Sequence, residues 1–119
     1  MVAFIVDFNI LQGETYDETT TWKVGSPAVV VDLSGYTARA QVRSRVSSTD
    51  VLLELTTENG GIVLGGTAGT IRRTLSATVT AGITWNGGVY DLELVAPGGV
   101  VVRRFMSGQV NISKEVTRV

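Results

Sequence analysis

The sequence predicts an all-β protein, an antiparallel β-sandwich of seven to nine strands in one domain over residues 1–119. Apolar and polar residues alternate with a period of two over most of the chain, which is typical of half-buried strands. Turn-forming residues recur at short intervals, as they do between the strands of sandwiches and barrels. A chain of 119 residues is long enough for one hydrophobic core and leaves little room for a second.

The alternation is clearest over residues 37–46, 51–56 and 89–95. A longer strand is expected from Val100 to Ile112, with a bend or bulge at Gly108 because glycine often marks such irregularities. Side chains of alternate strand residues point to opposite faces, so one set in each segment is assigned to the core. The predicted core residues are Ala40, Val42, Leu53, Leu55, Ile71, Tyr90, Leu92, Leu94 and Val110.

Glycine-rich turns separate these strands. We expect a hairpin turn at Asn59-Gly60-Gly61, where glycine tolerates a positive φ, and further turns at Gly65-Gly66 and Pro97–Gly99. A short helical turn is predicted near residues 76–82, capped by the Ser76 side chain and ended by Gly82, crossing from one sheet to the other. No segment is long enough for the crossover helix of a βαβ unit, so we expect no parallel sheet.

A more specific architecture is suggested around Tyr90. In immunoglobulin-like domains a tyrosine corner places a tyrosine two residues before a core position of a late strand. Tyr90 has this spacing from Leu92, which stands where a disulfide-bearing domain has cysteine, and Trp22 or Trp85 is a candidate core aromatic. The alternative is that Tyr90 is an ordinary half-buried strand residue. The prediction is an immunoglobulin-like sandwich.

The composition excludes most catalytic chemistry. The chain has no cysteine and no histidine, which removes thiolate sites, the commonest metal ligand and the commonest general base. The acidic residues between 7 and 18 lack the spacing of a calcium loop, and Asp91 and Glu93 fit the outer face of a strand better than a catalytic pair. We therefore predict a protein that is not an enzyme, with no metal and no cofactor.

Two classes of partner are also disfavoured. A net charge of −1 does not suit a nucleic-acid-binding protein, which needs a basic surplus. The apolar start, residues 1–6, is interrupted by Asp7 and is too short for a membrane span, and it lacks the layout of a signal peptide. We expect no binding to nucleic acid or membrane, and a first β-strand at this position.

That first strand, from Val2 to Leu11, is unusually apolar. If Phe4, Val6, Phe8 and Ile10 face the core, the apolar residues of the other set need cover from a partner. The alternative is that the strand is central and covered within its own chain. The residues of this strand assigned to a partner interface are Ala3, Ile5 and Leu11.

The paired arginines at 72–73 and 103–104 add to this candidate interface. Adjacent strand residues point to opposite faces, so one arginine of each pair nominally faces the core unless a bulge places both outside. Arginine is favoured where a charge is partly desolvated against another protein. The alternative is strand-flanking charge that blocks edge pairing. The arginine candidates for the interface are Arg73 and Arg104. The carboxyl end could also reach a partner, and it adds Val116, Arg118 and Val119.

Several short motifs occur in a suggestive order. They are Ile10-x-Gln12-Gly13-x-Thr15, Thr21-Trp22, Asp32-Leu-Ser-Gly-Tyr-Thr-Ala-Arg39-x-Gln41-x-Arg43, Leu53-x-Leu55-Thr56, the Asn59-Gly turn, Leu75-Ser-Ala77, Tyr90-Asp-Leu-Glu-Leu94, Gly108-x-Val110 and Val116-Thr-Arg118. Together they resemble small tailed-bacteriophage proteins with an immunoglobulin-like β-sandwich, including the collar or connector proteins that attach tail fibres to the tail tip. The corner at residues 32–36 also resembles the amino-terminal domain of phage baseplate upper proteins.

The resemblance implies a structural virion protein, a tail-associated adaptor that docks fibres or baseplate components. Expected partners are copies of itself, arranged in a ring of head-to-tail contacts, and other phage structural proteins. The expected location is the virion, in the tail rather than the capsid, after assembly in the host cytoplasm. The alternatives are a capsid decoration protein and a carbohydrate-binding module, although the latter needs exposed aromatic residues on one side.

Overall fold

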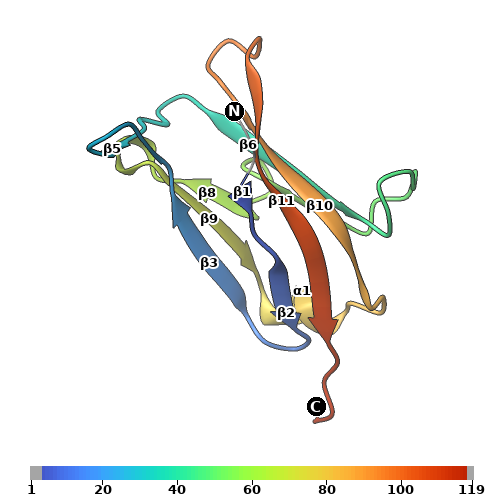
Figure 1. Cartoon of the computed structure of the whole chain (residues 1–119). Helices are drawn as coiled ribbons and strands as arrows, with labels where there is room; N and C mark the ends of the chain where they lie inside the picture. Colours follow the sequence, from blue (N-terminus) through green and yellow to red (C-terminus); the bar gives the residue numbers. More distant parts are fainter. Residues whose placement is uncertain (1–3, 118–119) are drawn as a thin grey trace.

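A computed structural model describes residues 4–117 and places them in two β-sheets that face each other across a common core (Figure 1). The large sheet contains, in spatial order, β1 (Phe4–Ile5) and β2 (Phe8–Leu11) along one edge, β11 (Val102–Ser113), β10 (Gly87–Val95), β6 (Thr37–Arg43) and β7 (Leu53–Thr56). The small sheet has the order β3 (Tyr16–Thr21), β9 (Thr70–Leu75) and β8 (Ile62–Leu64).

Three short elements complete the structure. A separate hairpin is formed by β4 (Lys23–Val24) and β5 (Val29–Val30), and the 3-10 turn η1 (Gly66–Ala68) joins β8 to β9. The helical turn α1 (Ala77–Ala81) carries the chain from β9 in the small sheet to β10 in the large one. The Ser76 side chain accepts a hydrogen bond from the Val79 N–H, so the predicted cap and crossing are both confirmed.

The core between the sheets contains eight of the nine predicted residues: Ala40, Val42, Leu55, Ile71, Tyr90, Leu92, Leu94 and Val110 are buried. Leu53 is only partly buried, contrary to the prediction. It lies at the start of β7, the outermost strand on its side of the large sheet, where no further strand covers it. Of the two tryptophans, Trp22 is buried and Trp85 is half-buried.

The turn at Asn59-Gly60-Gly61 does not close a hairpin, as the sequence had suggested. β7 before it pairs with β6 in the large sheet, whereas β8 after it pairs with β9 in the small sheet. Gly60 has a φ of +82°, so the conformational freedom of glycine is used here, but it turns the chain between sheets.

The expectation of purely antiparallel pairing is also wrong at one edge. β1 and β2 both run parallel to β11, with Phe4 opposite Met106 and Phe8 opposite Val110. A parallel pair needs a long connection, and the sequence offers no crossover helix. Here the connection is the intervening body of the sandwich, because β11 is the last strand and the first strand packs beside it.

A β-bulge interrupts β11 at Phe105, not at Gly108. Leu92 lies opposite Met106 while Glu93 lies opposite Arg104, which leaves Phe105 as the extra residue. Phe105 and Met106 are therefore both buried although they are adjacent. Arg103 and Arg104 are both exposed, but the bulge does not lie between them: Arg104 is opposite the outward Glu93, and Arg103 is opposite the inward Leu94 near the start of β11.

Tyr90 does not form a tyrosine corner. Its hydroxyl donates a hydrogen bond to the carbonyl oxygen of Val6 in the first strand, instead of reaching back to the backbone a few residues upstream. The ring is buried and stacks on Phe8, with the ring centroids 3.9 Å apart. Burial raises the pKa of Tyr90 well above its usual range, so the neutral hydroxyl is the stable donor.

Candidate interaction surfaces

The first candidate surface is the edge formed by β1 and β2. Two residues, Val6 and Asp7, separate these strands and still hold the chain against β11. The Val6 N–H donates to the Ser107 carbonyl, and Asp7 Oδ1 accepts from the Gln109 N–H at 3.0 Å. A side chain thus takes the place of a main-chain partner where the strand is interrupted.

Gly108 makes this attachment possible. A Cβ at position 108 would lie 2.5 Å from the Val6 carbonyl oxygen and 2.8 Å from Asp7 Oδ1. Real Cβ atoms do not approach other atoms so closely. Tyr90, directly opposite Gly108 in the sheet, reaches across the glycine to the same Val6 carbonyl. Gly108 therefore serves the close approach of another strand, and not the bend or bulge that the sequence had suggested.

The apolar residues of the first strand divide as the sequence indicated. Phe8 and Ile10 are buried, while Ile5 and Leu11 are 76% and 48% exposed. Phe4 faces the core side but is itself 47% exposed, and packs edge-to-face on Phe105. Because β1 and β2 are the outermost strands, the alternative of a central first strand is wrong. Ile5 and Leu11 lie at an edge that the described residues leave open.

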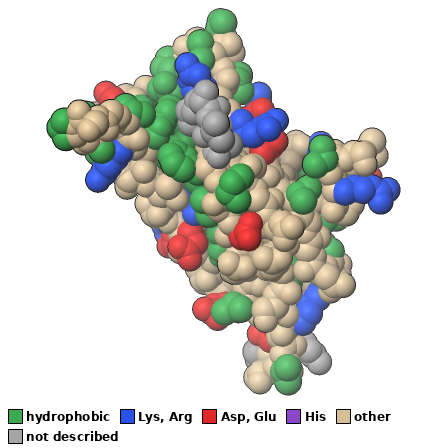
Figure 2. Space-filling model, in the orientation of Figure 1, with side chains coloured by type: hydrophobic (Ala, Val, Ile, Leu, Met, Phe, Trp, Pro, Cys, Tyr) green, Lys and Arg blue, Asp and Glu red, His purple; other side chains and the backbone are tan. Residues whose placement is uncertain are grey.

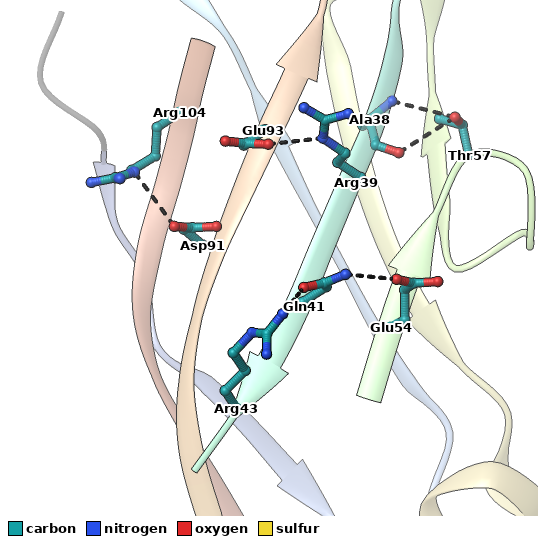
Figure 3. A network of polar contacts seen from close by, with 9 residues as sticks. All are labelled: Ala38, Arg39, Gln41, Arg43, Glu54, Thr57, Asp91, Glu93 and Arg104. Carbon is teal, nitrogen blue, oxygen red and sulfur yellow. Dashed lines mark hydrogen bonds and ion pairs between the residues drawn. The ribbon is translucent and has the colours of Figure 1, made fainter. Parts of the chain in front are cut away.

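The second candidate surface is the outer face of the large sheet (Figure 3). Oppositely charged residues on neighbouring strands are paired there: Arg39 with Glu93 at 2.8 Å, and Arg104 with Asp91 at 3.5 Å. The same face carries two shallow hollows of about 500 and 400 Å³, one over β6, β7 and β10 and one over β6, β10 and β11. Exposed ion pairs contribute little to stability, so this face is best described as a polar surface of both signs.

A network of hydrogen bonds extends this face towards β7. Gln41 joins two neighbours, since its Nε2 donates to Glu54 at 2.9 Å and its Oε1 accepts from Arg43 at 2.7 Å. The charges of Arg39, Glu93 and Glu54 are thus largely satisfied within the chain. Asp91 and Glu93 engage separate arginines, which supports the sequence interpretation of an outer strand face rather than a catalytic pair.

Arg73 is not a surface residue, which corrects its assignment to a partner interface. It is 2% exposed, and its Nη1 donates to Thr20 Oγ1 and to the Ile71 carbonyl. The guanidinium lies over the Phe8 ring, 5.7 Å from the ring centroid. The inner arginine of this pair is therefore held within its own chain by an aromatic ring and neutral acceptors. Its neighbour Arg72 faces outward.

Arg72 forms the best-oriented ion pair of the small sheet. Its Nε and Nη2 donate to the two carboxylate oxygens of Asp17 at 2.8 and 2.7 Å, a bidentate arrangement between β9 and β3. The hydrogen bond from Arg72 lowers the pKa of the Asp17 carboxyl below its usual range. This pair could not be predicted from the sequence, because the register between β3 and β9 decides which residues are opposed.

The remaining predicted interface residues have different outcomes. Arg104 is exposed on the outer face, and Val116 is 91% exposed beyond the end of β11. Ala3, Arg118 and Val119 lie outside the described residues. The carboxyl-terminal segment leaves the sandwich at the end opposite the β4–β5 hairpin (Figure 1).

Sequence reasoning missed the apolar hairpin tips. Valines of the β4–β5 hairpin and of the loop between β10 and β11 are exposed; they are Val24, Val29, Val30, Val100, Val101 and Val102. Figure 2 shows hydrophobic side chains gathered around the β4–β5 end and along the first strand. Runs of consecutive valines without alternation were the available signal, since consecutive residues of a strand point to opposite faces and cannot all face one core.

Within the described residues no group of three or more acidic or other metal-binding side chains is placed to hold a metal ion. Over the same residues, no helix is both long and apolar enough to cross a membrane. Among the described aromatic side chains, Phe4 is the one with a largely exposed ring, while Tyr36 and Trp85 are half-buried.

No protein-family model and no curated protein matches the sequence significantly. Solved structures do match over nearly the whole chain. One is Tim-1, with a TM-score of 0.48 and 14% identity, covering 100% of each chain. Another is the extracellular domain of the voltage-gated sodium channel β4 subunit, with a TM-score of 0.51 and 9% identity, covering 98% of this chain and 97% of that one. The likeness to the β4 domain shows an immunoglobulin-like β-sandwich, and an identity this low establishes the fold alone.

Proposed function

We propose that this chain is a structural protein of a tailed-phage virion, a non-catalytic adaptor that docks tail fibres or baseplate components. Its binding surfaces in this proposal are strand edges and exposed apolar side chains. The observation that carries the proposal is the outermost position of β1 and β2, with Ile5 76% exposed and Leu11 48% exposed. Exposed apolar side chains along a sheet edge favour side-chain contact with another protein.

Three further points support an interaction role. The sequence motifs resemble those of phage collar, connector and baseplate sandwiches. The extracellular domains of the sodium channel β4 subunit form parallel homodimers that explain its role in cell–cell adhesion, so a sandwich of this kind is able to act through contacts between copies. The absence of histidine and cysteine from the sequence removes the usual groups for catalysis.

A carbohydrate-binding function has less support. Sugar-binding faces use clusters of exposed aromatic rings, and Phe4 is the largely exposed one among the described residues. The outer face of the large sheet offers ion pairs and amides in its hollows, and the one aromatic residue that lines them, Tyr90, has its ring buried against Phe8. A capsid decoration role uses the same chemistry as the tail adaptor, so location in the virion has to decide between them.

The test has two parts. Mass spectrometry of virions dissected into tails and capsids is expected to find the chain in the tail fraction, and detection in capsids alone would favour the decoration protein. Binding of purified protein to tails lacking it is expected to fall at least ten-fold in the Ile5→Lys/Leu11→Lys variant. The matched control is Val63→Lys, because Val63 is similarly exposed, at 45%, but lies on β8. Equal binding by all three proteins would contradict docking through the first strand.

A further inference from the structure

The free edges of the two sheets differ in how they are protected. At the β7 edge the Asn59 side chain folds back: its Oδ1 accepts from the Thr56 N–H and its Nδ2 donates to the Glu54 carbonyl. These bonds occupy the main-chain groups to which a strand from another chain would hydrogen-bond. β8 is only three residues long, and the β1–β2 edge is interrupted at residues 6–7. Short, interrupted or capped edges resist pairing.

The β3 edge has none of these protections within the described chain. It is six residues long, lies at the end of the small sheet, and contains no proline, glycine or lysine (Figure 1). Asp17, Glu18, Thr19 and Thr21 are exposed. Threonine favours strands, so the edge is extended and available along its length.

The register shows which main-chain groups of β3 point outward. The Gly65 N–H donates to the Thr70 carbonyl and the Thr74 N–H to the Gly61 carbonyl, so even-numbered residues of β9 face β8. The odd-numbered residues of β9 therefore face β3, where they lie opposite its even-numbered residues. The bond from the Trp22 N–H to the Gly69 carbonyl continues this pattern.

It follows that Asp17, Thr19 and Thr21 direct their N–H and C=O groups away from the sheet. Within the described residues no hydrogen bond reaches these main-chain groups: the hydrogen bonds to Asp17 end on its carboxylate, from Arg72. An antiparallel strand is the partner that such a row of alternating donors and acceptors fits.

We propose that the partner is β3 of a second copy, paired antiparallel about a two-fold axis through Thr19. In this register Thr19 lies opposite Thr19 of the other copy, and Asp17 lies opposite Thr21. About six main-chain hydrogen bonds would form, joining the two small sheets into one continuous sheet. The inference rests on the contacts between copies that support the proposed function, and it takes a two-fold contact in place of the head-to-tail ring expected from the sequence.

The side chains of β3 suit this register. Each carboxylate meets a hydroxyl, since Asp17 lies opposite Thr21 and Glu18 opposite Thr20, so no two acidic residues are directly opposed. The charge of Asp17 is already compensated by the bidentate bond from Arg72. A symmetric, self-complementary edge is what a two-fold contact between identical chains requires. The β1–β2 edge stays free for another protein.

The test is sedimentation velocity with two substitutions at one position. Thr19→Pro removes the outward N–H and leaves the bonds to β9 in place, because edge strands tolerate proline where the N–H faces solvent. Thr19→Val keeps the N–H and the strand propensity. We expect wild type and Thr19→Val to dimerise and Thr19→Pro to dimerise at least ten-fold more weakly. A monomeric wild type at all soluble concentrations, or equal dimerisation of Thr19→Pro, would overturn the proposal.

A second measurement decides the question if Thr19→Pro fails to fold. The chain contains no cysteine, so Thr19→Cys carries a single thiol. Directly opposed residues of a hydrogen-bonded antiparallel pair have Cα atoms about 5.5 Å apart, within disulfide range. Mild oxidation is expected to link Thr19→Cys into dimers much faster than the control Thr56→Cys on the capped β7 edge. Equal rates would refute the β3 contact, while binding to tails through Ile5 would be unaffected by that result.

Discussion

Replacing Gly108 with alanine is expected to loosen the first strand from the sandwich. The new Cβ would lie 2.5 Å from the Val6 carbonyl oxygen, which is main chain and cannot rotate away as a flexible side chain can. Overpacking of this kind costs about 1–3 kcal/mol. If Val6 moves, the hydrogen bond from Tyr90 is also lost, which adds about 1 kcal/mol. The loss of chain entropy in the unfolded state offsets only about 0.4–1 kcal/mol.

We therefore expect Gly108→Ala to lower the free energy of unfolding by about 1–3 kcal/mol, measured by urea denaturation with an unchanged m-value. Gly82→Ala is the matched control, because its Cβ would meet the nearest atom at an ordinary 3.5 Å and its φ of −80° suits alanine. Gly82→Ala should be neutral or stabilising. Equal stability of Gly108→Ala and wild type would show that the first strand is not held as described.

Three other predictions follow from the core and the ionisable groups. Leu92→Ala should cost about 2–5 kcal/mol in urea denaturation, because Leu92 is fully buried; a change within error would contradict its packing. Asp17 should titrate by NMR below the usual aspartate range, and Arg72→Gln should restore it. The Asp17–Arg72 contribution to stability is thus present above the unfolded pKa and lost as pH falls through the folded one. Burial raises the pKa of both Tyr16 and Tyr90, so their contribution to stability is present below the unfolded tyrosine pKa and lost above it; Tyr90→Phe should reduce the loss seen in alkaline melting curves, and an unchanged loss would argue against it.

Alternation was a reliable guide where a strand lies inside a sheet. Along β6 and β10 one face meets the core and the other meets solvent, so the period of two identified Ala40, Val42, Leu92 and Leu94 correctly. It failed for Leu53, which is the first residue of the edge strand β7 and is only partly buried, whereas Leu55 on the same face is fully buried. Local pattern gives the face of a residue, but its depth depends on neighbours that are distant in the sequence.

Features that depend on strand neighbours were the ones that sequence reasoning missed. The parallel placement of β1 and β2 beside β11 joins the two ends of the chain, and no local signal encodes it. The partner of the Tyr90 hydroxyl follows from that placement, since Val6 is 84 residues away. The burial of the Arg73 side chain likewise depends on a distant neighbour, the Phe8 ring from the opposite sheet.

The candidate surfaces were predicted in part. The two-sided apolar pattern of the first strand identified Ile5 and Leu11, because an edge strand can bury only one of its faces. The openness of β3 was not predicted, since its polar threonine-rich sequence reads as an ordinary surface strand. Its significance depends on the capping of β7 by Asn59 and on the register with β9, which only the folded chain provides.

The central claim is that the chain acts by binding other structural proteins through the edge that carries Ile5 and Leu11. The most direct measurement is co-sedimentation of the purified protein with phage tails from which it has been removed. We expect saturable binding by wild type and by Val63→Lys, and binding at least ten-fold weaker by Ile5→Lys/Leu11→Lys with the fold intact. No binding of wild type to tails, or full binding of the double variant, would contradict it.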